Sequence, residues 1–194
     1  VLMDMKNKNI VDSPYFEFLR YCLREDEAEP KGIANINWDR LYDFGKKQAI
    51  LGVLYHGLQR LSASDYRPNR QQVLKWYSTY LSIEKANRQA YKDASALTEL
   101  LYKNYGIKGC VLKGQANALM YPDPYMRTPG DIDLWTDAKT LDIIRVSRKL
   151  DKSGEIGYHH IELSYFKTPV EIHFFPSFMG NVWHEYKLRR FFNS

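Results

Sequence analysis

The stretch from Asn69 to Tyr105 limits the fold of this chain more than any other feature. It contains no proline and no glycine, and helix-forming residues dominate it. At about 1.5 Å per residue, the stretch predicts a single helix roughly 55 Å long. Gly106 is expected to end this helix at its C′ position. Apolar side chains recur along the stretch at intervals of three and four residues, which is typical of one helix face: Leu74, Tyr77, Leu81, Ile83, Ala86, Ala90, Ala94, Leu97, Leu100 and Leu101.

Helical patterns also dominate the chain before this stretch. Ser13 as N-cap and Pro14 at the first helical position predict a helix that ends at Arg24. Asn37 is expected to cap a second helix, and the apolar spacing predicts that this helix continues to Leu61. The N-terminal part therefore reads as wholly helical.

After Gly106 the pattern changes to short strands alternating with helices. Four segments have the character of strands: "IKGCVL", "DIDLWT", "YHHIELSYF" and "VEIHFF". Three others have the character of helices: "GQANALMY", residues 138–150 and "NVWHEYKLRRFF". We therefore expect an α+β fold. A helical N-terminal region, residues 1–106, would pack on a minimal α/β core with a mixed sheet, residues 107–194.

The composition limits where the protein is expected to reside and which partners it is expected to bind. No apolar run approaches the ~18 residues that a membrane span needs, and the N-terminus lacks a signal-peptide pattern. Cys22 and Cys110 have no metal-binding spacing and read as reduced thiols. The net charge of +5 suits anionic ligands, but the basic residues are spread along the chain. We expect a cytoplasmic protein with no membrane partner and no long nucleic acid as ligand.

The segment "DIDLWT" places two carboxylates inside an apolar strand, where charge is costly without a partner. Because strand side chains alternate between faces, Asp131 and Asp133 share one face, and Glu171 in "VEIH" is a third strand acid. If the two strands are neighbours, the three carboxylates converge and can hold Mg²⁺, or Mn²⁺ in its place. The alternative is structural: Asp131 begins a turn after Pro129 and Gly130, Asp133 lies at a sheet edge, and Glu171 is an exposed carboxylate.

Upstream of the acids, Gly114 lies where a predicted strand meets a predicted helix. Free N–H groups at such a junction can bind phosphate. Lys113 and Arg127 can neutralise phosphate charge, Arg127 with two parallel hydrogen bonds. In the alternative interpretation, Arg127 fastens its loop to an acidic side chain. Together with the metal, these residues describe a binding site for a nucleoside triphosphate.

Histidines accompany the predicted acids in both later strands. His173 lies two residues from Glu171 on the same strand face, and we expect it to lie near the substrate. His160 and Glu162 also share a face, which invites a zinc interpretation, but the sequence offers no third spaced ligand. For His159 and His160 we therefore expect a structural role or contact with an acceptor.

The segments "VLKG", "GDIDLW" and "VEIH" together resemble the uncharacterised bacterial nucleotidyltransferases of the polymerase-beta-like superfamily. The resemblance extends upstream over "INWDRLYDFGKKQAILGVLYHGL" and covers roughly residues 35 to 175. It implies that Asp131, Asp133 and Glu171 hold the metal and that Gly114 and Gln115 approach the triphosphate. In that superfamily a smaller residue usually follows the motif glycine, so Gln115 is expected to crowd the phosphate. Such proteins are usually longer, and we expect that a C-terminal part is missing here.

The preferred function is transfer of a nucleoside monophosphate from a nucleoside triphosphate (NTP) to an acceptor hydroxyl, with release of pyrophosphate. The acceptor is not identified by the sequence and is a small molecule, a protein side chain or an RNA end. Two alternatives stay open. One is a non-catalytic module that binds a nucleotide or a partner, and the other is a metal-dependent phosphoesterase that uses the same carboxylates.

Overall fold

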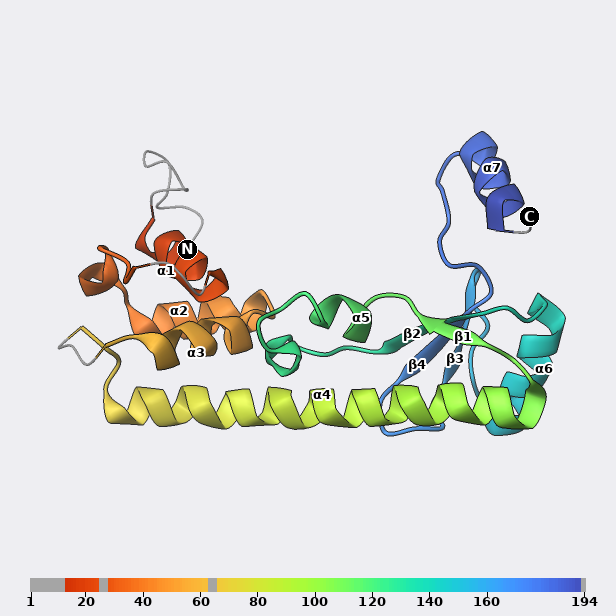
Figure 1. The fold of residues 1–194 in the computed structure, drawn as a ribbon, viewed down its shortest axis with the longest axis horizontal. Helices are drawn as coiled ribbons and strands as arrows, with labels where there is room; N and C mark the ends of the chain where they lie inside the picture. Colours follow the sequence, from red (N-terminus) through yellow and green to blue (C-terminus); the bar gives the residue numbers. More distant parts are fainter. Residues whose placement is uncertain (1–12, 25–27, 63–65, 193–194) are drawn as a thin grey trace. The chain divides into compact units, whose positions relative to one another are not determined.

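The computed structural model describes residues 13–24, 28–62 and 66–192 (Figure 1). Within these residues the chain forms seven α-helices and one mixed sheet of four strands, so the predicted α+β class is confirmed. The helices are α1 (Pro14–Leu23), α2 (Trp38–Lys47), α3 (Leu51–Arg60), α4 (Arg70–Tyr105), α5 (Gln115–Ala118), α6 (Thr140–Leu150) and α7 (Val182–Phe192). The strands are β1 (Gly109–Val111), β2 (Ile132–Thr136), β3 (His160–Leu163) and β4 (Val170–His173). Two 3₁₀ turns, η2 (Ile33–Asn35) and η3 (Pro124–Met126), complete the regular structure.

The chain divides into two compact units by its internal contacts. The first comprises the residues up to Asn87 together with Ala118–Thr128, and the second comprises Arg88–Asn117 together with the residues from Pro129 onward. Helix α4 contributes residues to both units. The domain boundary that we expect at Gly106 stays a prediction.

Helix α4 is the long helix that the sequence predicts. It runs without interruption from Arg70 to Tyr105, and Gly106 follows with a φ of +68°. The Gly106 N–H donates to the Tyr102 carbonyl at 2.9 Å, so the predicted C′ glycine is confirmed. No helix in the described part of the chain, α4 included, is long and apolar enough to cross a membrane.

The first unit has an aromatic core between its short helices. The Phe18 and Trp38 rings meet edge to face, with centroids 5.3 Å apart, and Trp76 of α4 packs against Trp38. Helices α1 and α3 approach closely at Gly57, where a Cβ atom would lie 2.2 Å from the Cys22 sulfur. Cys22 is buried and its thiol is free, as we predicted for both cysteines.

The predicted single helix from Asn37 to Leu61 is wrong, because the chain turns between α2 and α3. Ala49 adopts a φ of +56°, and the Ile50 N–H donates to the Gly45 carbonyl instead of continuing the helix. The Asn37 cap is confirmed, since its side chain accepts from the Arg40 N–H at 3.1 Å. Both helices bury one apolar face in the same core, so the apolar spacing continues across the turn and conceals it.

The loop Ala118–Thr128 belongs to the first unit because its backbone binds the helices there. Gly52 of α3 leaves room for the Met126 carbonyl, which would lie 2.0 Å from an added Cβ atom. The buried Asn87 amide of α4 donates to the carbonyls of Tyr125 and Arg127. These contacts fix the backbone on which Arg127 stands.

The second unit is built around the sheet, whose strand order is β1-β2-β4-β3. Strands β2 and β4 run parallel, and the other two pairs are antiparallel. One face is apolar and packs with Leu97 and Leu101 of α4 and Ile143 of α6. Six side chains from three strands cover this face, each 2% exposed or less: Ile132, Leu134, Ile161, Leu163, Val170 and Ile172. The opposite face therefore receives the polar residues that alternate with them.

Candidate functional site

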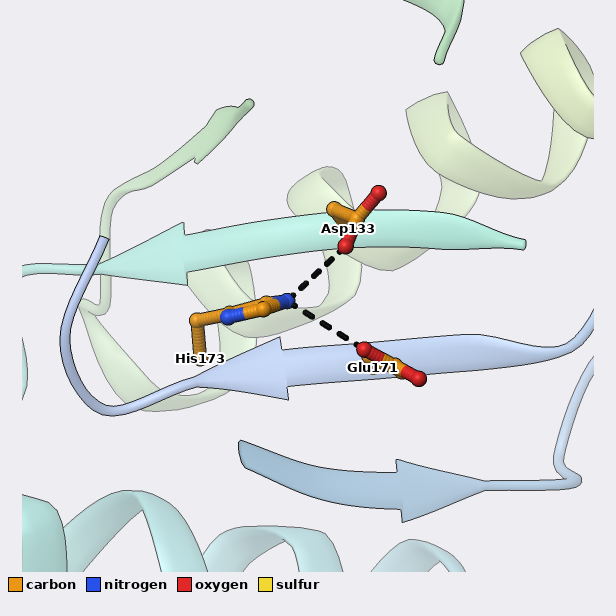
Figure 2. Close-up of side chains that lie close together, drawn as sticks. All are labelled: Asp133, Glu171 and His173. Carbon is orange, nitrogen blue, oxygen red and sulfur yellow. Dashed lines mark hydrogen bonds and ion pairs between the residues drawn. The ribbon is translucent and has the colours of Figure 1, made fainter. Parts of the chain in front are cut away.

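The polar face of the sheet brings together two of the three predicted acids. Parallel pairing of β2 with β4 places Asp133 directly opposite Glu171, and His173 follows two residues later on the same face. The His173 Nε2 atom lies 2.9 Å from Asp133 Oδ1 and 3.5 Å from Glu171 Oε2 (Figure 2). One ligand atom from each residue lies within 4.8 Å of the other two, which is a spacing that a single metal ion can bridge.

Burial makes this contact electrostatically important. The side chains of Asp133 and His173 are 5% and 4% exposed, whereas that of Glu171 is 26% exposed. A buried carboxylate is unfavourable without a charged or hydrogen-bonding partner. Asp133 has two such partners on one oxygen, the His173 ring and the Lys113 ammonium.

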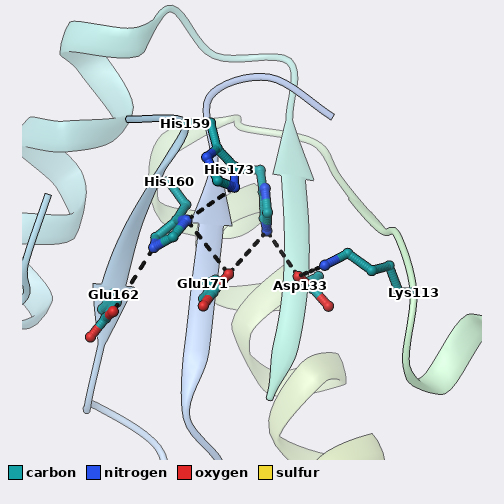
Figure 3. Close-up of polar contacts among 7 residues, drawn as sticks. All are labelled: Lys113, Asp133, His159, His160, Glu162, Glu171 and His173. Atoms are coloured by element: carbon teal, nitrogen blue, oxygen red, sulfur yellow. Dashed lines mark hydrogen bonds and ion pairs between the residues drawn. The ribbon is translucent and has the colours of Figure 1, made fainter. Parts of the chain in front are cut away.

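Lys113 reaches this oxygen from the loop between β1 and α5. Its Nζ atom lies 2.7 Å from Asp133 Oδ1 (Figure 3). The hydrogen bond to Asp133 raises the pKa of Lys113 against the opposing effect of burial, and the charges of Asp133, Asp131 and Glu171 raise it further. The ammonium is therefore held in its charged form, and its side chain remains 61% exposed.

Asp131 lies immediately before β2 and is half-buried. Among the described residues it does not join Asp133, Glu171 and His173 in the group that could hold a metal ion. Together with Glu162 and Glu171 it lines a pocket of about 210 Å³. The structure thus brings Asp133 and Glu171 into direct convergence and places Asp131 at the adjoining pocket.

Gly114 and Gln115 form the junction between β1 and α5, as the sequence predicts. Gly114 has a φ of +53°, which favours glycine. The Gln115 side chain is buried, and neither amide atom has a hydrogen-bond partner among the described residues. Tyr91 of α4 donates its hydroxyl to the Gln115 carbonyl at 2.8 Å and holds this junction. Gln115 is only 3% exposed, and the expectation that it crowds the phosphate stays a prediction.

Arg127 stands in the other compact unit, where its guanidinium donates to the Thr128 carbonyl at 3.3 Å. Its predicted contact with phosphate stays a prediction. So does the alternative in which it fastens its loop to an acid.

A family model described as an uncharacterised nucleotidyltransferase matches residues 34–184. The chain belongs to this nucleotidyltransferase family. The match includes Lys113, Asp133, Glu171 and His173, so every residue of the convergent group lies inside it. No curated protein and no solved structure matches this nucleotidyltransferase.

His160 of β3 and the preceding His159 extend the polar face of the nucleotidyltransferase beyond the predicted acids. His160 Nδ1 lies 3.3 Å from His159 Nε2 and 3.6 Å from Glu171 Oε2 (Figure 3). Burial lowers the pKa of His159, and the charges of His160, His173 and Lys113 lower it further. His159 is therefore held in the neutral form, which can bind a metal or accept a hydrogen bond.

From the sequence we expected His173 to lie near the substrate. In the structure its ring lies between Asp133 and Glu171. The signal was its spacing of two residues from Glu171, which fixes a shared strand face. The contact with Asp133 depends on the parallel register of β2 and β4, and a single sequence does not reveal that register.

Proposed function

We propose that this chain transfers a nucleoside monophosphate from an NTP to an acceptor hydroxyl and releases pyrophosphate, with Mg²⁺ or Mn²⁺ as the required ion. The supporting observation is the convergence of Asp133, Glu171 and His173 inside the region that matches a nucleotidyltransferase family. Asp131 would join these ligands through the adjoining pocket.

The side chains present fit a divalent cation. Carboxylate oxygens are the ligands that Mg²⁺ prefers, and an added imidazole is compatible with Mn²⁺. The buried Asp133 oxygen already binds one cationic group, the Lys113 ammonium, which a metal ion would replace. When bound, the ion would polarise the phosphoryl oxygens and stabilise charge on the leaving pyrophosphate.

Lys113 would act in binding and in charge balance. Without the ion its ammonium compensates Asp133, and its largely exposed side chain is free to turn away. With Asp133 bound to a cation, the Lys113 ammonium would be available to bind the triphosphate beside the adjacent Gly114. The backbone at Gly114, where the chain turns with positive φ, would let the phosphates approach closely.

His173 would hold the two strands of the site in register with each other. Its ring contacts carboxylates from both β2 and β4, and it is almost completely buried. The ring thereby orients Asp133 and Glu171 before any ligand arrives. The acceptor hydroxyl would approach from the open side of Glu171, which lines the pocket with Asp131 and Glu162.

An NTP labelled at the α-phosphate tests the proposal. The protein is incubated with this NTP, Mg²⁺ and cell extract, and the products are separated and identified by mass spectrometry. Label on an acceptor supports the proposal. Free nucleoside monophosphate would indicate a phosphoesterase, and the absence of turnover would indicate a binding module.

Two variants make the experiment specific to the site. Asp133→Asn should reduce label transfer at least about 100-fold, because even residues that only orient metal ligands change activity by about 10- to 100-fold. Asp142→Asn on the surface of α6 removes an exposed carboxylate that pairs with Arg145, and should transfer label like the wild type. Equal loss in both variants would contradict a role for Asp133 in the reaction.

A further inference from the structure

A second group of metal-binding side chains lies on the β3 side of Glu171. Antiparallel pairing of β3 with β4 places Glu162 opposite Glu171 and His160 opposite His173. His160 Nε2 lies 3.9 Å from Glu162 Oε1, and His160 Nδ1 lies 3.6 Å from Glu171 Oε2. We propose that His160, Glu162 and Glu171 form a separate binding site for a divalent transition-metal ion, with Zn²⁺ as the preferred ion.

The spacing of the donor atoms fits such an ion. One atom from each of the three residues lies within 4.8 Å of the other two. Ligands about 2.0–2.1 Å from a tetrahedral Zn²⁺ lie about 3.3 Å from one another. The ligand atoms therefore need only small side-chain movements to bind, without a change in the strands that carry them.

The adjoining pocket provides room and a favourable charge. It has a volume of about 210 Å³ and is lined by three carboxylates, those of Asp131, Glu162 and Glu171, with no lysine or arginine among its lining residues. Three carboxylates along one pocket attract a cation, and the pocket leaves space for a water molecule as a further ligand. The Glu162 side chain is 57% exposed, so an ion can enter from solvent.

The imidazole of His160 determines which ion this site prefers. Mg²⁺ selects oxygen ligands, whereas a histidine with two carboxylates is a suitable ligand set for Zn²⁺. With Nε2 as the ligand atom beside Glu162, His160 Nδ1 lies 3.3 Å from His159 Nε2 and 3.6 Å from Glu171 Oε2, so the Glu171 carboxylate would have to turn toward the ion. A hydrogen bond from the non-ligating nitrogen orients the ring, as is usual for histidines that bind metals. The side chain of His160 is only 17% exposed, which also restricts its orientation.

This site is separable from the proposed nucleotidyl transfer. It shares Glu171 with the group at Asp133, but His160 and Glu162 contact neither Asp133 nor Lys113 in Figure 3. Binding of Zn²⁺ needs no nucleotide, so its measurement does not depend on catalysis.

The test counts bound Zn²⁺ ions per chain, by equilibrium dialysis followed by elemental analysis in the absence of nucleotide. The double variant His160→Gln/Glu162→Gln should bind one ion fewer than the wild type. The matched control His184→Gln/Glu155→Gln removes one imidazole and one carboxylate at exposed positions elsewhere, and should bind as many ions as the wild type. Cobalt(II) provides a second readout, since its visible absorption should lose the contribution of a histidine-ligated ion in the double variant.

Equal Zn²⁺ stoichiometry in the wild type and the double variant would overturn the proposal. The single variant Glu162→Gln changes an exposed, nearly isosteric side chain and should show the same loss in a folded protein. Label transfer from NTP is measured separately. A protein that loses one Zn²⁺ in the variant but never transfers label would keep this site and refute the proposed function.

Discussion

At the scale of single residues, the proposed metal site depends most on Asp133. Its Oδ1 atom receives both the Lys113 ammonium and the His173 ring, although its side chain is only 5% exposed. Removing one partner of a buried charge is costly, because the remaining charge is left uncompensated. These two contacts therefore orient the Asp133 carboxylate before a metal ion arrives.

Replacing Lys113 should raise the affinity for Mn²⁺ and lower the affinity for NTP. In Lys113→Met no ammonium competes for Asp133, so the affinity for Mn²⁺ should rise several-fold. The affinity for NTP should fall about 10- to 100-fold, because a charge-assisted hydrogen bond contributes about 1.5–3 kcal/mol. Electron paramagnetic resonance measures the free Mn²⁺, and calorimetry measures NTP binding.

Lys108→Met provides the control for this substitution, since Lys108 is an exposed lysine just before β1. It should leave both affinities unchanged. If Lys113→Met weakens Mn²⁺ and NTP binding together, Lys113 does not exchange between Asp133 and phosphate.

Asp151 connects the end of α6 to the residue after β3 and makes stability depend on pH. Hydrogen bonds from the Ser153 hydroxyl, the Ser164 N–H and the Ser153 N–H lower its pKa from 3.8 to about 2. Because the pKa is lower in the folded protein, this contribution is fully present above about pH 4 and is lost as the pH falls toward 2. Thermal unfolding from pH 2 to pH 6 should show Asp151→Asn less stable than the wild type at pH 6. The difference should shrink below pH 4, and a difference that is constant with pH would contradict this role.

At the scale of elements, the turn between α2 and α3 contains an alanine in the left-handed region. Ala49 has a φ of +56°, which costs a residue with a Cβ atom about 1–2 kcal/mol. Ala49→Gly should therefore stabilise the protein by about 0.5–1 kcal/mol, after the extra backbone entropy of glycine is subtracted. Urea unfolding measures the change as a higher midpoint.

The same substitution inside a helix should have the opposite sign. Ala96 lies at an exposed position in α4, where glycine costs about 1 kcal/mol relative to alanine. Ala96→Gly should lower the midpoint. Destabilisation by Ala49→Gly as well would mean that the turn is not strained at this residue.

The elements of the second unit were predictable because their signals are local. The run without proline or glycine predicts α4. Alternation predicts that Asp131 and Asp133 share one face of the strand in "DIDLWT", and that Glu171 and His173 share one face of the strand in "VEIH". The turn at Ala49 was not predictable, because no glycine or proline marks it. The contact of His160 with Glu171 was also missed, since it depends on how β3 aligns with β4.

At the scale of the whole molecule, each compact unit has a core of its own. Leu54 is fully buried in the core of the first unit, and Ile172 is fully buried in the second, on the sheet face opposite Glu171 and His173. Leu54→Ala and Ile172→Ala should each destabilise their unit by about 2–5 kcal/mol. Near the midpoint of thermal unfolding, Mn²⁺ binding should persist in Leu54→Ala and be lost in Ile172→Ala. Parallel loss of Mn²⁺ in both variants would show that the two cores unfold together.

The position of a bound ion shows directly whether Asp133, Glu171 and His173 hold a metal. Anomalous diffraction from crystals grown with Mn²⁺ locates the metal independently of any assay. We predict a peak between β2 and β4, within bonding distance of Asp133 Oδ1, Glu171 Oε2 and His173 Nε2, with the Lys113 ammonium moved away from Asp133. At saturating Mn²⁺, the absence of a peak between these strands, with Lys113 and His173 still on Asp133, would contradict it.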